Sequence, residues 1–247
     1  MKWDADLYQN KHSFVAEYGK ALLAYIPEDN RQFILDLGCG TGELTEQLLK
    51  KSVHVTGVDS SEDMIGKAKA AHPGISFEVM DACNLKWCDS FDVIFSNAVF
   101  HWIPDQKALL GSIYKALKTG GRLICEFGAH GNVSAIREAF VSQVRHLDCT
   151  YTNPFFLPSG KDYRTLLEEA GFRIQIIKEF DRPTPLNDGE LGIRNWIKQF
   201  FSNELLSFPE EVREKLLADV EHALRPQLWN GTQWVADYRR LQAVAVK

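Results

Sequence analysis

Short apolar runs with the character of buried strands recur along the first half of the chain, each followed by a segment of helical periodicity. Four of them are Phe33–Leu37, Val53–Val58, Ile75–Met80 and Phe91–Ser96. A fifth strand is predicted over 122–127, introduced by Gly120 and Gly121. This alternation of strands and helices predicts an α/β fold in which helices cover both faces of a parallel sheet.

The pattern continues toward the two ends of the chain. Apolar residues at helical spacing from Phe14 to Ile26 predict an N-terminal helix, which Pro27 ends. Three elements are expected after residue 160: a helix over 162–170 ended by Gly171, a strand over 173–180, and a last strand within 234–246.

An additional helical segment separates the last two predicted strands. Pro183 and Pro185 mark a break, and amphipathic helices are predicted over 193–201 and over 212–224, the second ending before Pro226. Because their apolar faces must be covered, these helices either form a cap over the strand ends or extend the core.

The most specific motif ends the first strand, where Asp36 is followed by Gly38, Gly40 and Gly42. Glycine lets a ligand lie directly on the main chain, and a strand, glycine turn and helix start form the ligand-binding edge of open α/β sheets. A dinucleotide fingerprint needs a glycine three positions after Gly40, where this chain has Glu43. The alternative is a glycine-rich turn without a ligand.

The pattern D-x-G-x-G-x-G resembles the first motif of class I methyltransferases, which bind S-adenosylmethionine and release S-adenosylhomocysteine. The acid suits this cofactor, because its methionyl end carries an ammonium and a sulfonium, whereas a pyrophosphate would be repelled. The resemblance implies a Rossmann-like, doubly wound, seven-stranded and mostly parallel sheet, with an antiparallel seventh strand and a helical insertion before it.

A second acid, Asp59, ends the second strand about 20 positions beyond the glycine turn, where it can accept hydrogen bonds from both ribose hydroxyls. Ser60 or Ser61 can cap the next helix, with Asp63 in the place of a capping-box acid. The alternative is that Asp59 only favours the start of that helix.

The third and fourth strand ends complete the pattern. In the resembling family, an acid at the place of Asp81 and the next backbone amide grip the adenine edge, and the segment after the fourth strand passes beneath the methionine portion. The predicted cofactor-binding residues are Asp36, Gly38, Cys39, Gly40, Asp59, Ser60, Met64, Asp81, Ala82, Asn97 and Ala98.

Composition narrows the function classes. The 247 residues include 28 basic and 33 acidic side chains, a net charge of −5, and no pattern predicts a nucleic-acid groove, a metal site or a membrane span. Five cysteines without CxxC spacing indicate reduced thiols. With no apolar signal core at the N-terminus, we expect a cytoplasmic enzyme. The oligomeric state is left open.

A narrower resemblance, to the trans-aconitate methyltransferase group, rests on Trp3, Tyr8, the pair His101–Trp102 and the helical insertion. We therefore predict a single methyltransferase domain over 1–247. Its parts are an N-terminal helical lid at 1–30, a cofactor-binding half at 31–130, and a substrate-side half at 131–247 that includes the insertion at about 183–230.

His101 is the candidate catalytic residue, as a base or as a hydrogen-bond donor to the acceptor, unless it only packs beside Trp102. Transfer of a sulfonium methyl group is an in-line displacement, so the protein mainly aligns the reactants and excludes water. Arg194 is a further candidate partner for an acidic acceptor. The predicted pocket residues are Trp3, Tyr8, His12, Trp102, Phe155 and Trp196.

The favoured function is methylation of a small molecule at a carboxylate oxygen, because a carboxylate is ionised at neutral pH and needs no base. One alternative is a C-, N- or phenolic O-methyltransferase of the quinone or natural-product type. Another is a protein that binds S-adenosylmethionine without transferring the methyl group. Glu43 disfavours a nicotinamide oxidoreductase.

Overall fold

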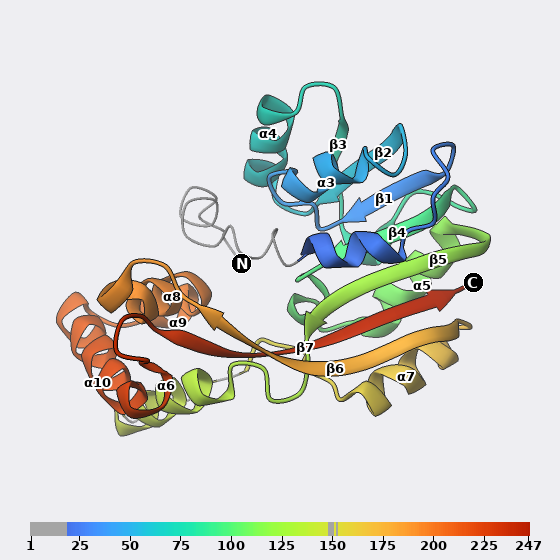
Figure 1. Ribbon diagram of the computed structural model, residues 1–247. Coiled ribbons are helices and arrows are strands. Elements are labelled where there is room, and N and C mark those ends of the chain that lie inside the picture. The colour runs from blue at the N-terminus through green and yellow to red at the C-terminus, as the bar shows by residue number, and fades with distance from the viewer. Residues whose placement is uncertain (1–18, 148–150, 152) are drawn as a thin grey trace. The chain divides into compact units, whose positions relative to one another are not determined.

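The computed structural model describes residues 19–147, 151 and 153–247. Its sheet has seven strands in the order β3-β2-β1-β4-β5-β7-β6 (Figure 1). The strands are β1 (Phe33–Leu37), β2 (His54–Asp59), β3 (Ser76–Val79), β4 (Phe91–Asn97), β5 (Leu117–Gly128), β6 (Arg173–Pro185) and β7 (Val235–Val246). Strands β1 to β5 pair in parallel, and β7 pairs antiparallel with β5. The predicted Rossmann-like, doubly wound fold is confirmed.

The helices connect the strands in the predicted alternation. The α-helices are α3 (Glu43–Leu48), α4 (Glu62–Ala71), α5 (Gln106–Ala116), α6 (Ser134–His146), α7 (Gly160–Glu169), α8 (Gly192–Phe200), α9 (Ser202–Leu206) and α10 (Glu210–Leu228). The 3₁₀ helices are η1 (Lys20–Tyr25), η2 (Ala82–Asn84), η3 (Phe100–Trp102) and η4 (Gly189–Leu191). The helical insertion therefore lies between β6 and β7, as predicted.

Successive side chains of β5 point to opposite faces of the sheet, and both faces are covered. Cys125 and Phe127 belong to a core cluster that includes residues of α5 and α7. Ile124 belongs to a second cluster with Leu22 and Ile26, from the segment around η1. Burial on both faces explains the nearly continuous apolar character of the central strands.

By their internal contacts, the described residues form two compact units. The sheet unit contains residues 19–129, 155–179 and 240–247. The helical unit contains residues 130–147, 151, 153–154 and 180–239. Within the helical unit, α6, α8 and α10 gather beside the end of β6 and the start of β7 (Figure 1). Strands β6 and β7 each continue from one unit into the other.

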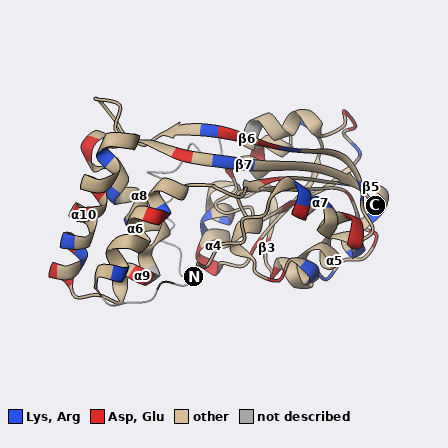
Figure 2. Ribbon diagram, turned by 90° about the horizontal axis from the view of Figure 1, so that it is seen from below, with Lys and Arg blue, Asp and Glu red and all other residues tan. Residues whose placement is uncertain are grey.

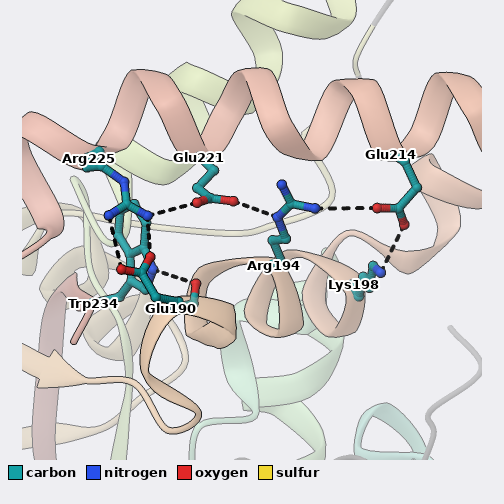
Figure 3. A network of polar contacts seen from close by, with 7 residues as sticks. All are labelled: Glu190, Arg194, Lys198, Glu214, Glu221, Arg225 and Trp234. Atoms are coloured by element: carbon teal, nitrogen blue, oxygen red, sulfur yellow. Dashed lines mark hydrogen bonds and ion pairs between the residues drawn. The ribbon is translucent and has the colours of Figure 1, made fainter. Parts of the chain in front are cut away.

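Charged side chains link α8 to α10 within the helical unit (Figure 3). Arg194 donates to Glu221 at 2.5 Å and to Glu214 at 3.4 Å, and Glu221 also accepts from Arg225 at 2.9 Å. Arg225 in turn bonds Glu190, whose main-chain oxygen accepts from the Trp234 indole. We call the charged residues of this network the charge ladder: Glu190, Arg194, Lys198, Glu214, Glu221 and Arg225.

Two predicted boundaries are wrong, both at prolines. Strand β6 extends through Pro183 to Pro185, because an edge strand needs no donor on its outer side. Helix α10 continues past Pro226 to Leu228. In a last turn, a proline removes only one hydrogen bond of the helix.

Other details of the prediction also change. Ser61 caps α4 through the Met64 amide, which places Asp63 at the second helical position rather than at the third, where a capping-box acid stands. Helix α6 was not predicted. Most of the predicted N-terminal helix lies outside the described residues, and its described part is the 3₁₀ turn η1.

Candidate active site

The glycine turn joins β1 to α3 with backbone conformations that favour glycine. The amides of Gly38 and Cys39 both donate to the Val58 carbonyl, at 2.8 and 2.9 Å. Gly38 has φ +77°, and a Cβ there would lie 2.2 Å from Val99 Cγ2. Gly40 has φ +54°, but no atom lies within 4 Å of the place of its Cβ. The turn is therefore packed at Gly38 and open at Gly40, where a ligand can approach the main chain.

Asp36 is a buried acid beneath this turn, with 2% of its surface exposed. Its Oδ2 accepts a hydrogen bond of 2.7 Å from the Thr45 hydroxyl of α3. Burial raises the pKa of Asp36 to about 7, the Thr45 bond opposes the rise, and the nearby Asp59 adds to it. A cation placed next to Asp36 would stabilise its ionised form and lower its pKa.

Asp59 connects the glycine turn to the start of α4. Its Oδ2 accepts from the Gly40 amide at 3.0 Å, and its Oδ1 accepts from the Ser61 amide at 2.9 Å. Burial raises the pKa of Asp59, while bonds from the Ser61, Gly40 and Ser60 amides lower it. The predicted effect on the helix start is therefore observed, together with a bond to the turn that was not predicted. Of the other residues predicted to bind the cofactor here, Met64 of α4 is buried and Ser60 is exposed.

The third and fourth strands end in polar or strained residues. Asp81 is exposed, and its Oδ1 accepts from the Cys83 amide at 2.9 Å, which caps η2 and orients Ala82. Asn97 is buried at the end of β4. Ala98 adopts φ +61°, a region that costs energy for a residue with a side chain, and its amide donates to the Glu126 carbonyl at 2.7 Å.

The sheet order brings the predicted cofactor residues together. Because β3, β2, β1 and β4 are neighbours and run in parallel, their carboxyl ends meet at one edge. The chain order reverses between β1 and β4, and open α/β sheets bind ligands at such a switch point.

His101 lies in η3 directly after β4, with 7% of its surface exposed. The Gly128 amide donates to its Nδ1 at 3.4 Å. Burial lowers the pKa of His101 well below 6.5, and the charge of Arg240 lowers it further. The imidazole is therefore neutral near pH 7. With Nδ1 as the acceptor, its proton lies on Nε2, and the ring can act as a hydrogen-bond donor there.

Two predicted pocket residues surround His101. The Trp102 ring centroid lies 5.1 Å from that of His101, and the Phe155 centroid lies 4.8 Å from that of Trp102. The Phe156 amide donates to the His101 carbonyl at 2.9 Å, which holds this segment against η3. His101 thus packs beside Trp102, which was the alternative to a catalytic role, but its Nε2–H can still donate a hydrogen bond.

The other predicted acceptor-side residues stay predictions. Trp3, Tyr8 and His12 lie outside the described residues. Trp196 is buried inside the helical unit at 2% exposure and donates to the Tyr238 hydroxyl at 2.8 Å. Arg194 belongs to the charge ladder.

A buried ion pair that was not predicted joins Glu126 of β5 to Arg240 of β7. Arg240 Nε lies 3.3 Å from Glu126 Oε1. Glu126 interrupts an apolar stretch of β5, but Arg240 lies among other polar residues of β7 and gave no such signal. A single sequence did not show that the two strands pair.

Acidic and basic residues are interspersed along α10 (Figure 2). Among the described residues, no helix combines the length and apolar character needed to cross a bilayer.

Known proteins resemble this chain in sequence and in fold. A family model described as a methyltransferase domain matches residues 35–125. An uncharacterised methyltransferase of Schizosaccharomyces pombe is 34% identical over 99% of this chain and 98% of its own length. A trans-aconitate 2-methyltransferase of Agrobacterium fabrum is 36% identical over 100% of both chains. The structure of YcgJ from Bacillus subtilis covers 94% of this chain and 98% of its own with a TM-score of 0.68 at 15% identity, and so shares the fold.

Proposed function

Since this chain belongs to the class I S-adenosylmethionine-dependent methyltransferases, we propose that it methylates a carboxylate oxygen of a small organic acid. The observation that carries the choice of acceptor atom is the state of His101. A neutral ring that offers an N–H suits an acceptor that is already ionised, and it does not suit an acceptor that must lose a proton. The similarity to a trans-aconitate 2-methyltransferase over the full chain points the same way.

The described residues fit the cofactor. Gly40 leaves the main chain open, and a buried acid with a raised pKa lies beneath the turn. In the proposed arrangement, Asp36 faces the methionyl ammonium and Asp59 accepts from the ribose hydroxyls. Asp81 and the Ala82 amide hold the adenine edge, while Asn97 and Ala98 support the methionine portion.

The proposed reaction needs no proton transfer. S-adenosylmethionine supplies a methyl group that its sulfonium already activates. The carboxylate oxygen forms a bond to the methyl carbon as the carbon–sulfur bond breaks, and the bonding electrons stay on sulfur. The chain contributes alignment: His101 Nε2–H holds the acceptor carboxylate, and the rings of Trp102 and Phe155 limit access of water.

An acceptor panel tests this proposal. Formation of S-adenosylhomocysteine is measured with small carboxylic acids, phenols and amines. We expect turnover with carboxylic acids and at most background rates with the other classes. Preferred turnover of phenols or amines would contradict the carboxylate assignment. Cofactor binding without turnover on any acceptor would favour a protein that only binds S-adenosylmethionine.

A further inference from the structure

The side chain of Gln106 bonds the main chain on both sides of His101. Gln106 is the first residue of α5, and only 5% of its surface is exposed. Its Nε2 donates to the Phe100 carbonyl at 2.9 Å and to the Ile103 carbonyl at 2.6 Å. Phe100 begins η3 and Ile103 follows its last residue. One carboxamide therefore bonds both ends of the turn that carries His101.

The turn η3 is too short to fix its own position. It spans three residues, and the hydrogen bonds of 3₁₀ turns have poorer geometry than those of α-helices. The bond that closes it, from the Ile103 amide to the Phe100 carbonyl, is 3.2 Å long. The chain enters η3 after Ala98, at φ +61°, a conformation that persists only where the surrounding structure holds it. Contacts from outside the turn must therefore set its geometry.

The imidazole of His101 depends on the main chain for its direction. The bond that its Nδ1 accepts from the Gly128 amide is 3.4 Å, longer than an ordinary N–H···N or N–H···O bond. The Phe156 amide donates to the His101 carbonyl at 2.9 Å, and so holds the main chain rather than the ring. The direction of Nε2–H therefore follows from how η3 is held, and Gln106 holds it at two points.

Stability alone does not account for a glutamine at this position. Its Oε1 is buried and has no hydrogen-bond partner within the part of the chain that the structure describes. The cost of this unpaired atom offsets the gain from the two bonds of Nε2. The carboxamide supplies two N–H donors on one planar group, which matches two neighbouring carbonyls. What the side chain adds is therefore the geometry of η3.

Resting on the proposed carboxyl methylation, we propose that Gln106 is a positioning residue for the acceptor: by bonding both ends of η3, it fixes the direction in which His101 Nε2–H meets the acceptor carboxylate. A donor that is already in place costs no reorganisation during the reaction. A displacement of about 1 Å can lower the rate by about a hundredfold. Gln106 acts through His101 and does not itself bind the acceptor.

Helix α5 also contacts the predicted cofactor edge, which supplies an internal control. Ser112 Oγ of α5 accepts from the amide of Leu85, the residue after η2, at 2.8 Å. Asp81, proposed to hold the adenine edge, caps the other end of η2. Because this bond does not involve Gln106, loss of the carboxamide should change the dissociation constant of S-adenosylmethionine by less than about twofold.

A double-mutant cycle tests whether Gln106 acts through His101. Gln106→Leu is made in the wild type and in His101→Phe, and kcat/KM is measured with trans-aconitate or the best carboxylic acid of the acceptor panel. In the wild type, Gln106→Leu should lower kcat/KM by about tenfold or more, because the donor is misplaced. In His101→Phe, the same change should lower it by less than about twofold, because that donor is already absent.

Two further variants serve this cycle. Gln106→Asn keeps the carboxamide but is too short to reach both carbonyls, so it should cause a smaller loss that also disappears in His101→Phe. Lys107→Gln, at the next and exposed position of α5, is the control and should leave kcat/KM unchanged.

A second measurement needs no acceptor. The protonation midpoint of His101 is followed by NMR, with its imidazole signals assigned from their loss in His101→Phe. Burial, together with the charge of Arg240, holds the pKa of His101 well below 6.5. Gln106→Leu should free η3, admit water to the ring and raise the midpoint toward 6.5, whereas Lys107→Gln should not move it.

Equal losses of kcat/KM in the two backgrounds, or an unmoved midpoint of His101, would overturn the assignment of Gln106 and leave carboxyl methylation intact. Gln106→Asn decides by the same criteria where Gln106→Leu does not fold. If the wild type methylates no carboxylic acid of the panel, the proposed function fails on its own, and the midpoint still decides whether Gln106 positions the ring.

Discussion

At the scale of single residues, the buried Asp36 and the half-buried Asp59 are the acids on which binding of the cofactor is proposed to depend. Asp36 is held by Thr45 beneath the glycine turn, and Asp59 holds the turn to the start of α4. Their surroundings differ, so the same substitution at each has a different expected result.

Asp59→Asn should weaken the binding of S-adenosylmethionine by about ten- to a hundredfold, because hydrogen bonds to a charged group contribute about 1.5–3 kcal/mol. The measurement is a dissociation constant by calorimetry, with circular dichroism to confirm the fold. Asp63→Asn, a change of an acid in the helix α4 that follows Asp59, is the control and should have little effect. Unchanged affinity in Asp59→Asn would rule out the ribose role.

Binding of S-adenosylmethionine should strengthen as the pH rises from 6 to 7.5. Burial raises the pKa of Asp36 to about 7, so most of the population is protonated at pH 6 and must ionise to pair with the ammonium. In Asp36→Asn, the dissociation constant of S-adenosylmethionine should be larger than in the wild type and nearly independent of pH over this range. An equally steep pH dependence in Asp36→Asn would show that another group is responsible.

His101 should act as a donor rather than as a base. At saturating cofactor and acceptor, kcat of the wild type should be level between pH 6 and 8, because the ring stays neutral. His101→Phe should lower kcat/KM by about ten- to a hundredfold through the lost bond to a charged acceptor, and His101→Gln, which keeps an N–H donor, should recover part of it. An acidic limb near pH 6.5 that disappears in His101→Gln would contradict this role.

At the scale of elements, the apolar patterns predicted the strands of the sheet, and the glycine positions predicted the turn between β1 and α3. Both signals are local, which is why one sequence carries them. The sequence did not predict features that depend on contacts between residues far apart in the chain. Pro183 is allowed because β6 is an edge strand, and the Glu126–Arg240 pair exists only because β5 lies beside β7.

The charge ladder connects α8 to α10, and Glu221 is the acid that pairs with both Arg194 and Arg225 (Figure 3). Burial opposes ionisation of Glu221, but bonds from Arg194 and Arg225 outweigh it and lower the pKa. Glu221→Gln should reduce the free energy of unfolding by about 1–2 kcal/mol at pH 7.

The loss of unfolding free energy in Glu221→Gln should become smaller as the pH falls. A lowered pKa stabilises the fold above the pKa of the unfolded state, and this contribution disappears as the pH falls through the lower, folded value. Asp219→Asn, a change at an exposed acid of α10, is the control and should alter stability by less than about 0.5 kcal/mol. Equal effects of the two variants in urea titrations would mean that the ladder contributes no specific stability.

At the scale of the whole molecule, the proposed acceptor site around His101 directly follows β4, one of the strands whose ends carry the predicted cofactor residues. The family relationship extends over its full length. The state of His101 could not be predicted from the sequence, because the ring owes its donor state to Gly128 and its low pKa to burial and to Arg240. Those neighbours come from strands far apart in the chain.

The central claim is that the methyl group of S-adenosylmethionine becomes a methyl ester. The most direct measurement is transfer of a labelled methyl group to trans-aconitate or fumarate, followed by treatment of the product with mild base. The account predicts release of the label as methanol. Label that resists base would place the methyl group on carbon, nitrogen or an ether oxygen and would contradict the account.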